Sequence, residues 1–337
     1  MRLYILLLLG LLISCSDDIN NQVWIIPSDQ VFDGGVGKDG IPSVDNPVFE
    51  QTQANTYLNP NDLVIGVVHN GQAKAYPHRI LDWHEIVNDQ IDDRAFALTY
   101  CPLTGTGVAW NREIEGEITT FGVSGKLYNT NLIPYDRKTD SYWSQMRLDC
   151  VQGELIETVI ETFPIIETTW ETWKAAYPNS IVMTLDTGFS RDYNDYPYDD
   201  YRTNHSRIFF PVEPSDSRLP AKERVLAVLT SLGNKVYSIE SFEEDEVITD
   251  LVGENEILVF GSKERNFVLA YENIGLQNVR ISDVNLAIAE DDNGNIITMD
   301  GTIIAGPLAG TQLVQAKSIL GYYFSLAAFY PEISIYE

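Results

Sequence analysis

Residues 63–76 read LVIGVVHNGQAKAY, two apolar runs that flank the pair Asn70-Gly71. Asn-Gly is well suited to the positive φ angles of a tight type I′ turn, so this stretch predicts a β-hairpin. Residues 225–237 read VLAVLTSLGNKVY and repeat the order of an apolar run, a glycine turn and a Lys-x-Tyr ending. Two distant regions of the chain therefore begin with the same kind of hairpin.

Further landmarks follow each hairpin in the same order, and a repeated order predicts an internal duplication. The two units span about residues 60–185 and 222–337, with 186–221 as the crossover between them. The predicted fold class is a β-rich α+β protein made of two tandem homologous β-dominated units, each ending in one helix. Residues 15–59 are predicted to form a tether and irregular structure. The matched segments are 63–67 with 225–229, 74–76 with 235–237, and 86–89 with 247–250.

Each unit ends in a predicted helix that carries an aromatic stripe. Residues 168–177 begin with a capping box of Thr168 and Glu171, and residues 318–330 form the second helix. Both helices stop just before a proline. In each, three large side chains lie three and four positions apart, which places them on one face and predicts core packing.

The composition indicates a folded protein with an acidic surface. The 337 residues are 44% hydrophobic and include 6 Trp, 18 Tyr and 13 Phe, which suffices for a sizeable core. Lys and Arg number 22 against 49 Asp and Glu, a formal net charge of −27. Because such a surface repels a phosphate backbone, we expect no nucleic-acid partner. Three cysteines are too few for a disulfide framework.

The N-terminus predicts an exported lipoprotein. Residues 1–14 combine one positive charge with an apolar run shorter than the ~20 residues of a membrane span, as in a signal peptide. A small residue directly before Cys15 resembles a bacterial lipobox, which favours cleavage and lipidation at Cys15 over a plain secretory signal. The lipid would anchor an extracytoplasmic protein to the outer membrane. Residues 16–18, Ser-Asp-Asp, resemble an acidic export tag and predict exposure at the cell surface.

Polar elements found in only one unit are the candidates for chemistry, because shared elements belong to the fold. His84 of the first unit has Asp245 as its counterpart. The segment 101–107, Cys-Pro-Leu-Thr-Gly-Thr-Gly, corresponds only to Phe-Gly-Ser-Lys at 260–263. The second unit also lacks a counterpart of residues 121–129. The first unit is therefore predicted to carry the site.

Seven unusual motifs occur in order: Ala75-Tyr76-Pro77, Trp83–Asp89, Thr99–Gly107, Phe121–Gly125, Tyr135-Asp136-Arg137, Ser141–Gln145 and Arg191-Asp192-Tyr193. Together they resemble the DUF3179 family, a set of bacterial and archaeal proteins of unassigned function. The resemblance runs from about residue 40 to the C-terminus, and it implies a family without a mechanism. Many members have a second cysteine where this chain has Thr104, so a dithiol reaction would need Cys150 as the partner of Cys101.

Cys101 and His84 form the predicted catalytic pair. Cys101 follows a strand and opens a Gly-Thr loop, and a nearby His84 would lower its pKa and activate the thiolate. With His78 as a third ligand, the same pair would suit a copper or zinc ion. Glu85 or Asp89 would then add a carboxylate. The alternative for a lone cysteine is a small buried side chain that only packs.

A non-catalytic binding protein is the rival prediction. Its polar loops would hold a small molecule or a sugar, and a surface scaffold without a small-molecule site is the third alternative. The acidic aromatic stretch 192–201 is predicted to be a solvated loop, with weak calcium binding as the alternative. The residues predicted to line the ligand site are Thr104, Gly105, Thr106, Ser124, Lys126, Tyr128 and Asn129.

Overall fold

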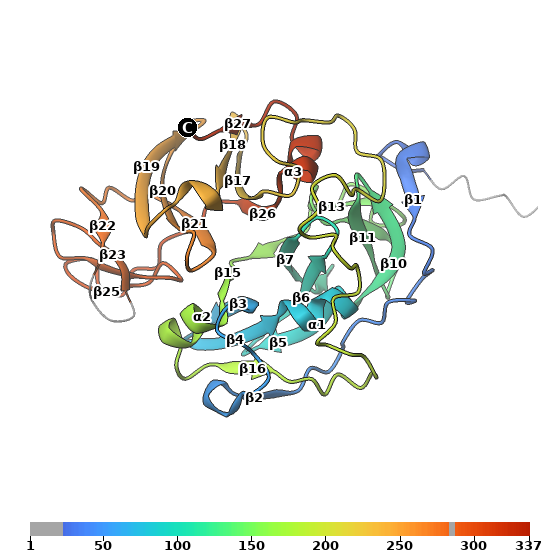
Figure 1. The fold of residues 1–337 in the computed structure, drawn as a ribbon, viewed down its shortest axis with the longest axis horizontal. Coiled ribbons are helices and arrows are strands. Elements are labelled where there is room, and N and C mark those ends of the chain that lie inside the picture. The colour runs from blue at the N-terminus through green and yellow to red at the C-terminus, as the bar shows by residue number, and fades with distance from the viewer. Residues whose placement is uncertain (1–22, 283–286) are drawn as a thin grey trace, which may run out of the picture.

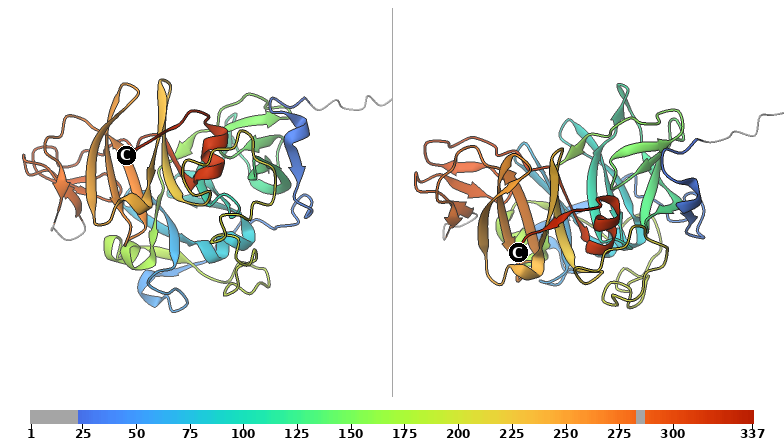
Figure 2. Two further views of the ribbon diagram at one scale, coloured as in Figure 1. Left: turned by 45° about the horizontal axis from the view of Figure 1, so that its top comes forward. Right: turned by 90° about the horizontal axis from the view of Figure 1, so that it is seen from above.

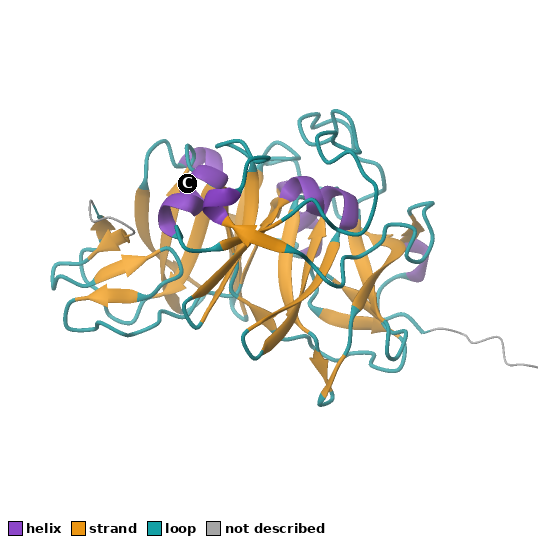
Figure 3. Cartoon of the chain, turned by 90° about the horizontal axis from the view of Figure 1, so that it is seen from below, coloured by secondary structure: helices purple, strands orange, loops and turns teal. Residues whose placement is uncertain are grey.

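The computed structural model describes residues 23–282 and 287–337, and strands dominate these ranges (Figure 1). The predicted signal peptide, Cys15 and the export tag lie outside the described residues. In the part of the chain that is described, no helix has the length and hydrophobicity that a bilayer span requires. Figure 3 shows how small the helical share is, which confirms the β-rich α+β class. The helices there are α1 (His78–His84), α2 (Trp170–Ala176) and α3 (Tyr323–Phe329), with 3-10 turns η1 (Ser28–Gln30), η2 (Thr52–Ala54) and η3 (Ile239–Ser241).

The N-terminal half forms three sheets and one small hairpin. The Asn70-Gly71 turn joins its first two long strands, as predicted, and sets His69 opposite Gln72. One sheet has the order β15 (Ile166–Thr169), β3 (Leu63–His69), β4 (Gln72–Pro77), β16 (Ile181–Met183), β2 (Phe49–Gln51). A second has the order β14 (Thr162–Phe163), β7 (Thr106–Asn111), β6 (Arg94–Cys101), β5 (Ile86–Ile91). The third has the order β1 (Val31–Asp33), β10 (Phe121–Tyr128), β11 (Asn131–Asp136), β12 (Tyr142–Ser144), β13 (Asp149–Gln152), and the hairpin is β8 (Glu113–Ile114) with β9 (Glu117–Ile118).

The C-terminal half lies beside the first half in all views and forms three smaller sheets (Figure 2). The first has the order β26 (Ser318–Tyr322), β17 (Arg224–Thr230), β18 (Gly233–Ser238), β27 (Ser334–Ile335). The second has the order β19 (Glu246–Val252), β20 (Asn255–Ser262), β21 (Phe267–Glu272). The third has the order β22 (Arg280–Ile281), β23 (Ala287–Glu290), β24 (Ile296–Thr298), β25 (Ile303–Ala305).

One sheet in each half has its strands in the same sequence of pairings. The order β15-β3-β4-β16 in the first half parallels β26-β17-β18-β27 in the second. In both, only the last of these pairs is parallel. The hairpin registers pair Val64 with Pro77 and Val225 with Ser238. By these registers Val64 is the counterpart of Val225. The match made from the sequence, Leu63 with Val225, differs from this by one residue.

The helices begin later than predicted, and one was not predicted. α2 begins at Trp170, because Thr169 is the N-cap and its hydroxyl accepts a hydrogen bond from the Thr172 backbone. α3 begins at Tyr323, because the five residues before it form the strand β26. From residue 23 onwards, the first half has two helices rather than one, since α1 precedes β5. A seven-residue helix is too short to give a clear period in the sequence.

The two halves share their hydrophobic cores. One core joins Trp110 of β7 with Val225 of β17, and another joins Trp173 of α2 with Phe260 of β20. The predicted core role of the aromatic stripe on α2 is confirmed, since Trp173 is fully buried. Its ring lies so close to Gly66 that a Cβ there would be 1.8 Å from the ring. Burial of this shared surface holds the site-bearing half against its neighbour.

Candidate functional site

Cys101 is a buried and inert thiol. It is the last residue of β6, with 1% of its surface exposed, and its Sγ donates to the Thr130 carbonyl at 3.7 Å. Burial raises the pKa of the Cys101 thiol to about 11, and the charge of Glu85 adds to this effect. The thiol is therefore protonated at neutral pH, which is the opposite of an activated nucleophile.

His84 does not activate Cys101, because both of its ring nitrogens have other partners. Nδ1 lies 2.7 Å from the Pro42 carbonyl oxygen, and Nε2 lies 2.7 Å from the Tyr193 hydroxyl. Since a carbonyl only accepts, Nδ1 carries the proton and Nε2 accepts from the tyrosine. Burial also lowers the pKa of His84. The structure therefore does not join His84 to Cys101 by a hydrogen bond, and His84 is a neutral histidine that fixes the end of α1.

The predicted copper or zinc site does not form either. His78 lies at the start of α1, where its Nε2 is 3.2 Å from Glu167 Oε1 and its ring packs on Tyr100. Among the described residues, only one group of three potential metal ligands comes together, and it contains neither His78 nor Cys101. That group is His69, Asp92 and Asp93.

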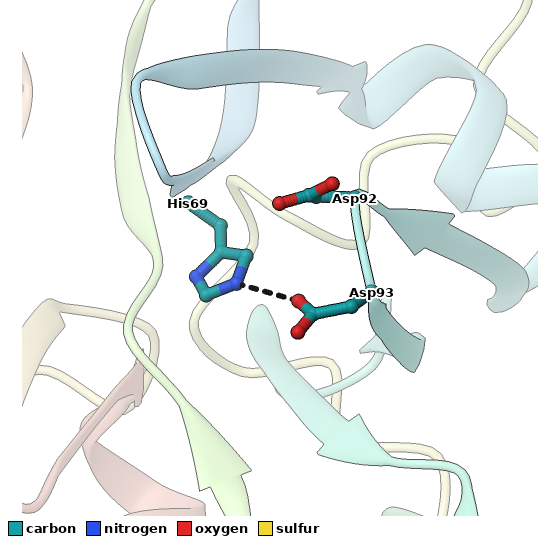
Figure 4. A group of neighbouring side chains, drawn as sticks. All are labelled: His69, Asp92 and Asp93. Carbon is teal, nitrogen blue, oxygen red and sulfur yellow. Dashed lines mark hydrogen bonds and ion pairs between the residues drawn. The ribbon is translucent and has the colours of Figure 1, made fainter.

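This group joins two neighbouring hairpin turns at the surface (Figure 4). His69 ends β3, and its Nε2 lies 3.2 Å from Asp93 Oδ1. Asp92 accepts a hydrogen bond from the Asn70 side chain at 2.9 Å. Asp93 leaves 83% of its side chain exposed, and existing contacts satisfy the group without an ion. We assign it no function.

Three residues of the Gly-Thr loop, Thr104, Gly105 and Thr106, are buried and make contacts inside the protein. Thr104 Oγ1 accepts a hydrogen bond from Asn131, and Thr106 Oγ1 donates to the Thr104 carbonyl. Gly105 has a φ of +59° and lies against Tyr322 of the second half, where a Cβ would be 2.9 Å from the ring. The ligand role predicted for these three loop residues is therefore wrong, and the loop serves to join the halves.

Residues 124–129 also form internal contacts, with one exception. Ser124 donates to the Ile133 carbonyl, and Tyr128 packs edge-on against Phe329 at 5.4 Å. The Asn129 side chain bonds the backbone of Glu213 in both directions and so holds the crossover in place. Lys126 alone among the predicted ligand residues lines a cavity.

That cavity has a volume of about 220 Å³ and mostly apolar walls. It lies between the segment that links β1 to β2, the Gly-Thr loop, the hairpin β10–β11 and the crossover. Val36 and Phe209 are partly exposed, at 46% and 39%. We call it the Glu85 pocket, and its lining residues are Gly34, Val36, Ile41, Glu85, Leu103, Val123, Gly125, Lys126, Leu127, Leu132, Ile133, Tyr198, Phe209 and Phe210.

Glu85 is held in the wall by an unusual backbone conformation. It is the C-cap of α1, with a φ of +56°, in the left-handed region where helices commonly place a glycine. Its side chain is buried, with one long hydrogen bond of 3.4 Å from the Tyr198 hydroxyl. A strained residue that carries an ionisable group into a cavity is typical of functional sites.

Burial raises the pKa of Glu85 from 4.5 to about 8, so the carboxyl is mostly protonated at pH 7. Burial and the nearby Glu85 charge also raise the pKa of Tyr198. Glu85 and Tyr198 in the wall, and the nearby Cys101 thiol outside it, therefore all hold their protons at neutral pH. At pH 7 the site can therefore donate and accept hydrogen bonds while remaining uncharged at Glu85.

A family model described as a protein of unknown function, DUF3179, matches residues 38–333. The chain belongs to the DUF3179 family. No curated protein and no solved structure matches it.

Motifs of the DUF3179 family meet at the pocket. Glu85, Leu103 and Val123 each belong to a different motif, and all three line the cavity. A fourth motif supplies Tyr193, whose hydroxyl holds His84 directly before Glu85 in the chain. Four of the seven motifs thus build the pocket wall or support it.

Sequence reasoning missed the aromatic wall, which the crossover provides. Tyr198, Phe209 and Phe210 all line the pocket. The prediction of a solvated loop at 192–201 is wrong for its tyrosines, since Tyr201 is fully buried and donates to the Leu103 carbonyl. The signal was present, because several tyrosines so close together rarely all stay in water.

Proposed function

We propose that this DUF3179 protein binds a small, largely apolar molecule in the Glu85 pocket. The observation that carries the proposal is a buried carboxyl without a cationic partner in an apolar cavity of about 220 Å³. Apolar walls with a few polar groups are typical of small-molecule sites. Such a site would bury most of a compact ligand, and Glu85 with Tyr198 would orient its polar group.

The contacts favour this role over the other functions predicted from the sequence. Thiol or metal chemistry at Cys101 and His84 would require a free imidazole nitrogen and an accessible thiolate, and the hydrogen bonds and burial oppose both. A sugar would present many hydroxyl groups to walls that offer few partners. A scaffold without a site gives no reason for the strained, buried Glu85.

We further propose that the two halves arose by duplication and that only the first kept a pocket. Beyond the shared strand order, each hairpin is held by the same three-residue contact. Lys74 and Tyr76 bind Asp89, as Lys235 and Tyr237 bind Asp250 at identical spacings. The counterpart of Glu85 in this alignment is Glu246, which is exposed at the start of β19.

We also propose that a lipid on Cys15 anchors the protein outside the cytoplasm, at the outer membrane and facing the cell exterior. The support is the apolar run, the small residue before Cys15 and the acidic residues after it. Replacing Cys15 with Ala should move the protein from the membrane fraction to the soluble fraction and abolish acyl labelling. Unchanged fractionation and labelling would contradict the anchor.

The pocket function is tested with a panel of small alcohols and amines, for example cyclohexanol, benzyl alcohol and benzylamine. Ligand-observed NMR should detect binding of at least one member. The variant Val36→Trp, at the partly exposed rim, should weaken that binding at least tenfold. The matched control Leu251→Trp places the same ring on an exposed site of β19 and should leave binding unchanged. No binding by any member, or equal binding by the Val36→Trp variant, would refute the proposal.

A further inference from the structure

We propose that the ligand of the Glu85 pocket is a small organic cation, an amine or a quaternary ammonium with apolar substituents. This inference rests on the proposed function and specifies the class of ligand. It follows from a comparison of Glu85 with the other buried carboxylates, and from the aromatic side chains that share its cavity.

Glu85 is the exception among the buried carboxylates in the described ranges, which are Asp82, Glu85, Asp136, Glu167 and Asp291. Asp82 and Glu167 each pair with an arginine. Asp136 and Asp291 each accept at least three hydrogen bonds from nearby donors. The side chain of Glu85 makes no ion pair and only the one hydrogen bond with Tyr198. Without a partner the carboxyl stays mostly protonated at pH 7, and a cationic ligand would supply the partner that its charged form lacks.

Aromatic rings line the same cavity and suit the rest of such a ligand. Tyr198 and Phe209 lie with their ring centroids 6.4 Å apart, and Phe210 adds a third ring to the lining. Ring faces attract organic cations by about 0.5–2 kcal/mol, and alkyl substituents would fill the apolar volume. A metal cation needs several oxygen or nitrogen ligands, which these walls do not offer.

The charge of the whole protein favours the same class of ligand. A net charge of −27 concentrates cations near the surface and repels anions. Lys126 on the β10 wall acts against this, because it is a positively charged residue of the cavity lining and would repel a cationic ligand. Lys126 makes no ion pair with Glu85 or with any other described residue. Removing its charge should therefore strengthen binding.

Cation binding is linked to release of a proton from Glu85. The titratable groups that interact with this carboxyl are the Cys101 thiol from β6 and the Tyr198 hydroxyl from the crossover, and Lys126 from β10 lines the same cavity. The thiol and the hydroxyl stay protonated and neutral at pH 8, because burial raises the pKa of both. A bound cation stabilises the carboxylate, so close to one proton should leave for each cation bound at pH 7. Affinity should rise with pH and level off above about pH 8.

The test compares choline with its neutral isostere 3,3-dimethylbutan-1-ol by titration calorimetry at pH 7. Two buffers of different ionisation enthalpy count the protons released. Choline should bind at least tenfold more tightly than the alcohol and release close to one proton. Glu85→Gln should weaken choline binding at least tenfold and change alcohol binding less than threefold. Lys126→Met should strengthen choline binding, and Glu246→Gln, the matched exposed position, should change neither ligand.

Two outcomes separate this inference from the proposed function. If the alcohol binds as tightly as choline, or if choline releases no proton, the ligand is not a cation and the pocket function stands. If neither probe binds and the panel of alcohols and amines gives no binding either, both proposals fail. Retained choline affinity in Glu85→Gln would also overturn the inference, because Glu85 would then not be the group that binds the cation.

Discussion

Replacing Glu85 with Gln should stabilise the protein, and by more as the pH rises. The folded chain holds the Glu85 proton to about pH 8, whereas the ordinary pKa is 4.5. This raised pKa gives stability that is fully present below pH 4.5 and is lost as the pH rises through about 8. At about 1.4 kcal/mol for each pH unit, the complete loss is at most about 5 kcal/mol. A glutamine side chain cannot ionise, so the variant avoids this loss.

Urea unfolding of both proteins at pH 5 and pH 8.5 measures the difference. We expect the free energy of unfolding of the Glu85→Gln variant, relative to the natural chain, to increase by at least about 2 kcal/mol between these two pH values. Glu246→Gln is the matched control, and because Glu246 is exposed its effect should not depend on pH. A Glu85→Gln effect that is equal at both pH values would show that Glu85 ionises freely, and the buried-acid reasoning would be wrong.

Three shorter predictions concern packing, the repeated contacts and the thiols. Gly66→Ala should destabilise the fold by about 3 kcal/mol or more through its clash with Trp173, against about 1 kcal/mol for Gly71→Ala in open space; equal losses in thermal unfolding would contradict this. Tyr76→Phe and Tyr237→Phe should each lower the free energy of unfolding in urea by about 2 kcal/mol, since each hydroxyl binds a carboxylate. If only one of the two substitutions destabilises the protein, the two contacts are not equivalent. Cys101 and Cys150 should not react with a thiol reagent at pH 8 until urea unfolds the chain, because burial raises the pKa of both to about 11; rapid labelling of the folded protein would refute their inertness.

Local patterns predict the hairpins and the β-rich class, because these depend on residues close in the chain. Asn70-Gly71 stands in the turn where it was expected. The helix starts at Trp170 and Tyr323 were harder to predict. In both cases a strand runs directly into the helix, and its sheet partner lies ninety or more residues away. The match of residues 63–67 with 225–229 also differs by one residue from the strand registers. An apolar run resembles itself when it is shifted by one residue, whereas the register fixes which residues lie opposite each other.

The site was harder to predict because its parts come from distant segments. The unusual residues were found, but their roles were not: His84 and Cys101 are unusual because they support the wall. Glu85 was considered only as a metal ligand, since its burial depends on the crossover, which carries Tyr198 more than one hundred residues later. Hydrogen bonds such as that of His84 to Pro42 cannot be inferred from spacing alone.

Two segments outside the matching hairpins bury Glu85, whereas its counterpart Glu246 stays exposed. In the first half, α1 ends where Pro42 and Tyr193 hold His84, and both of these residues lie outside the repeated hairpins. That end turns Glu85 inward, beneath the crossover. In the second half the shorter turn η3 occupies the place of α1, and Asp245 pairs with Arg265 at 3.2 Å instead. Nothing comparable covers Glu246, so the same acidic residue type stays in water. The difference between the halves therefore depends less on the Gly-Thr loop, which only the first half has, than on the segments of Pro42 and Tyr193 that help to bury one carboxylate.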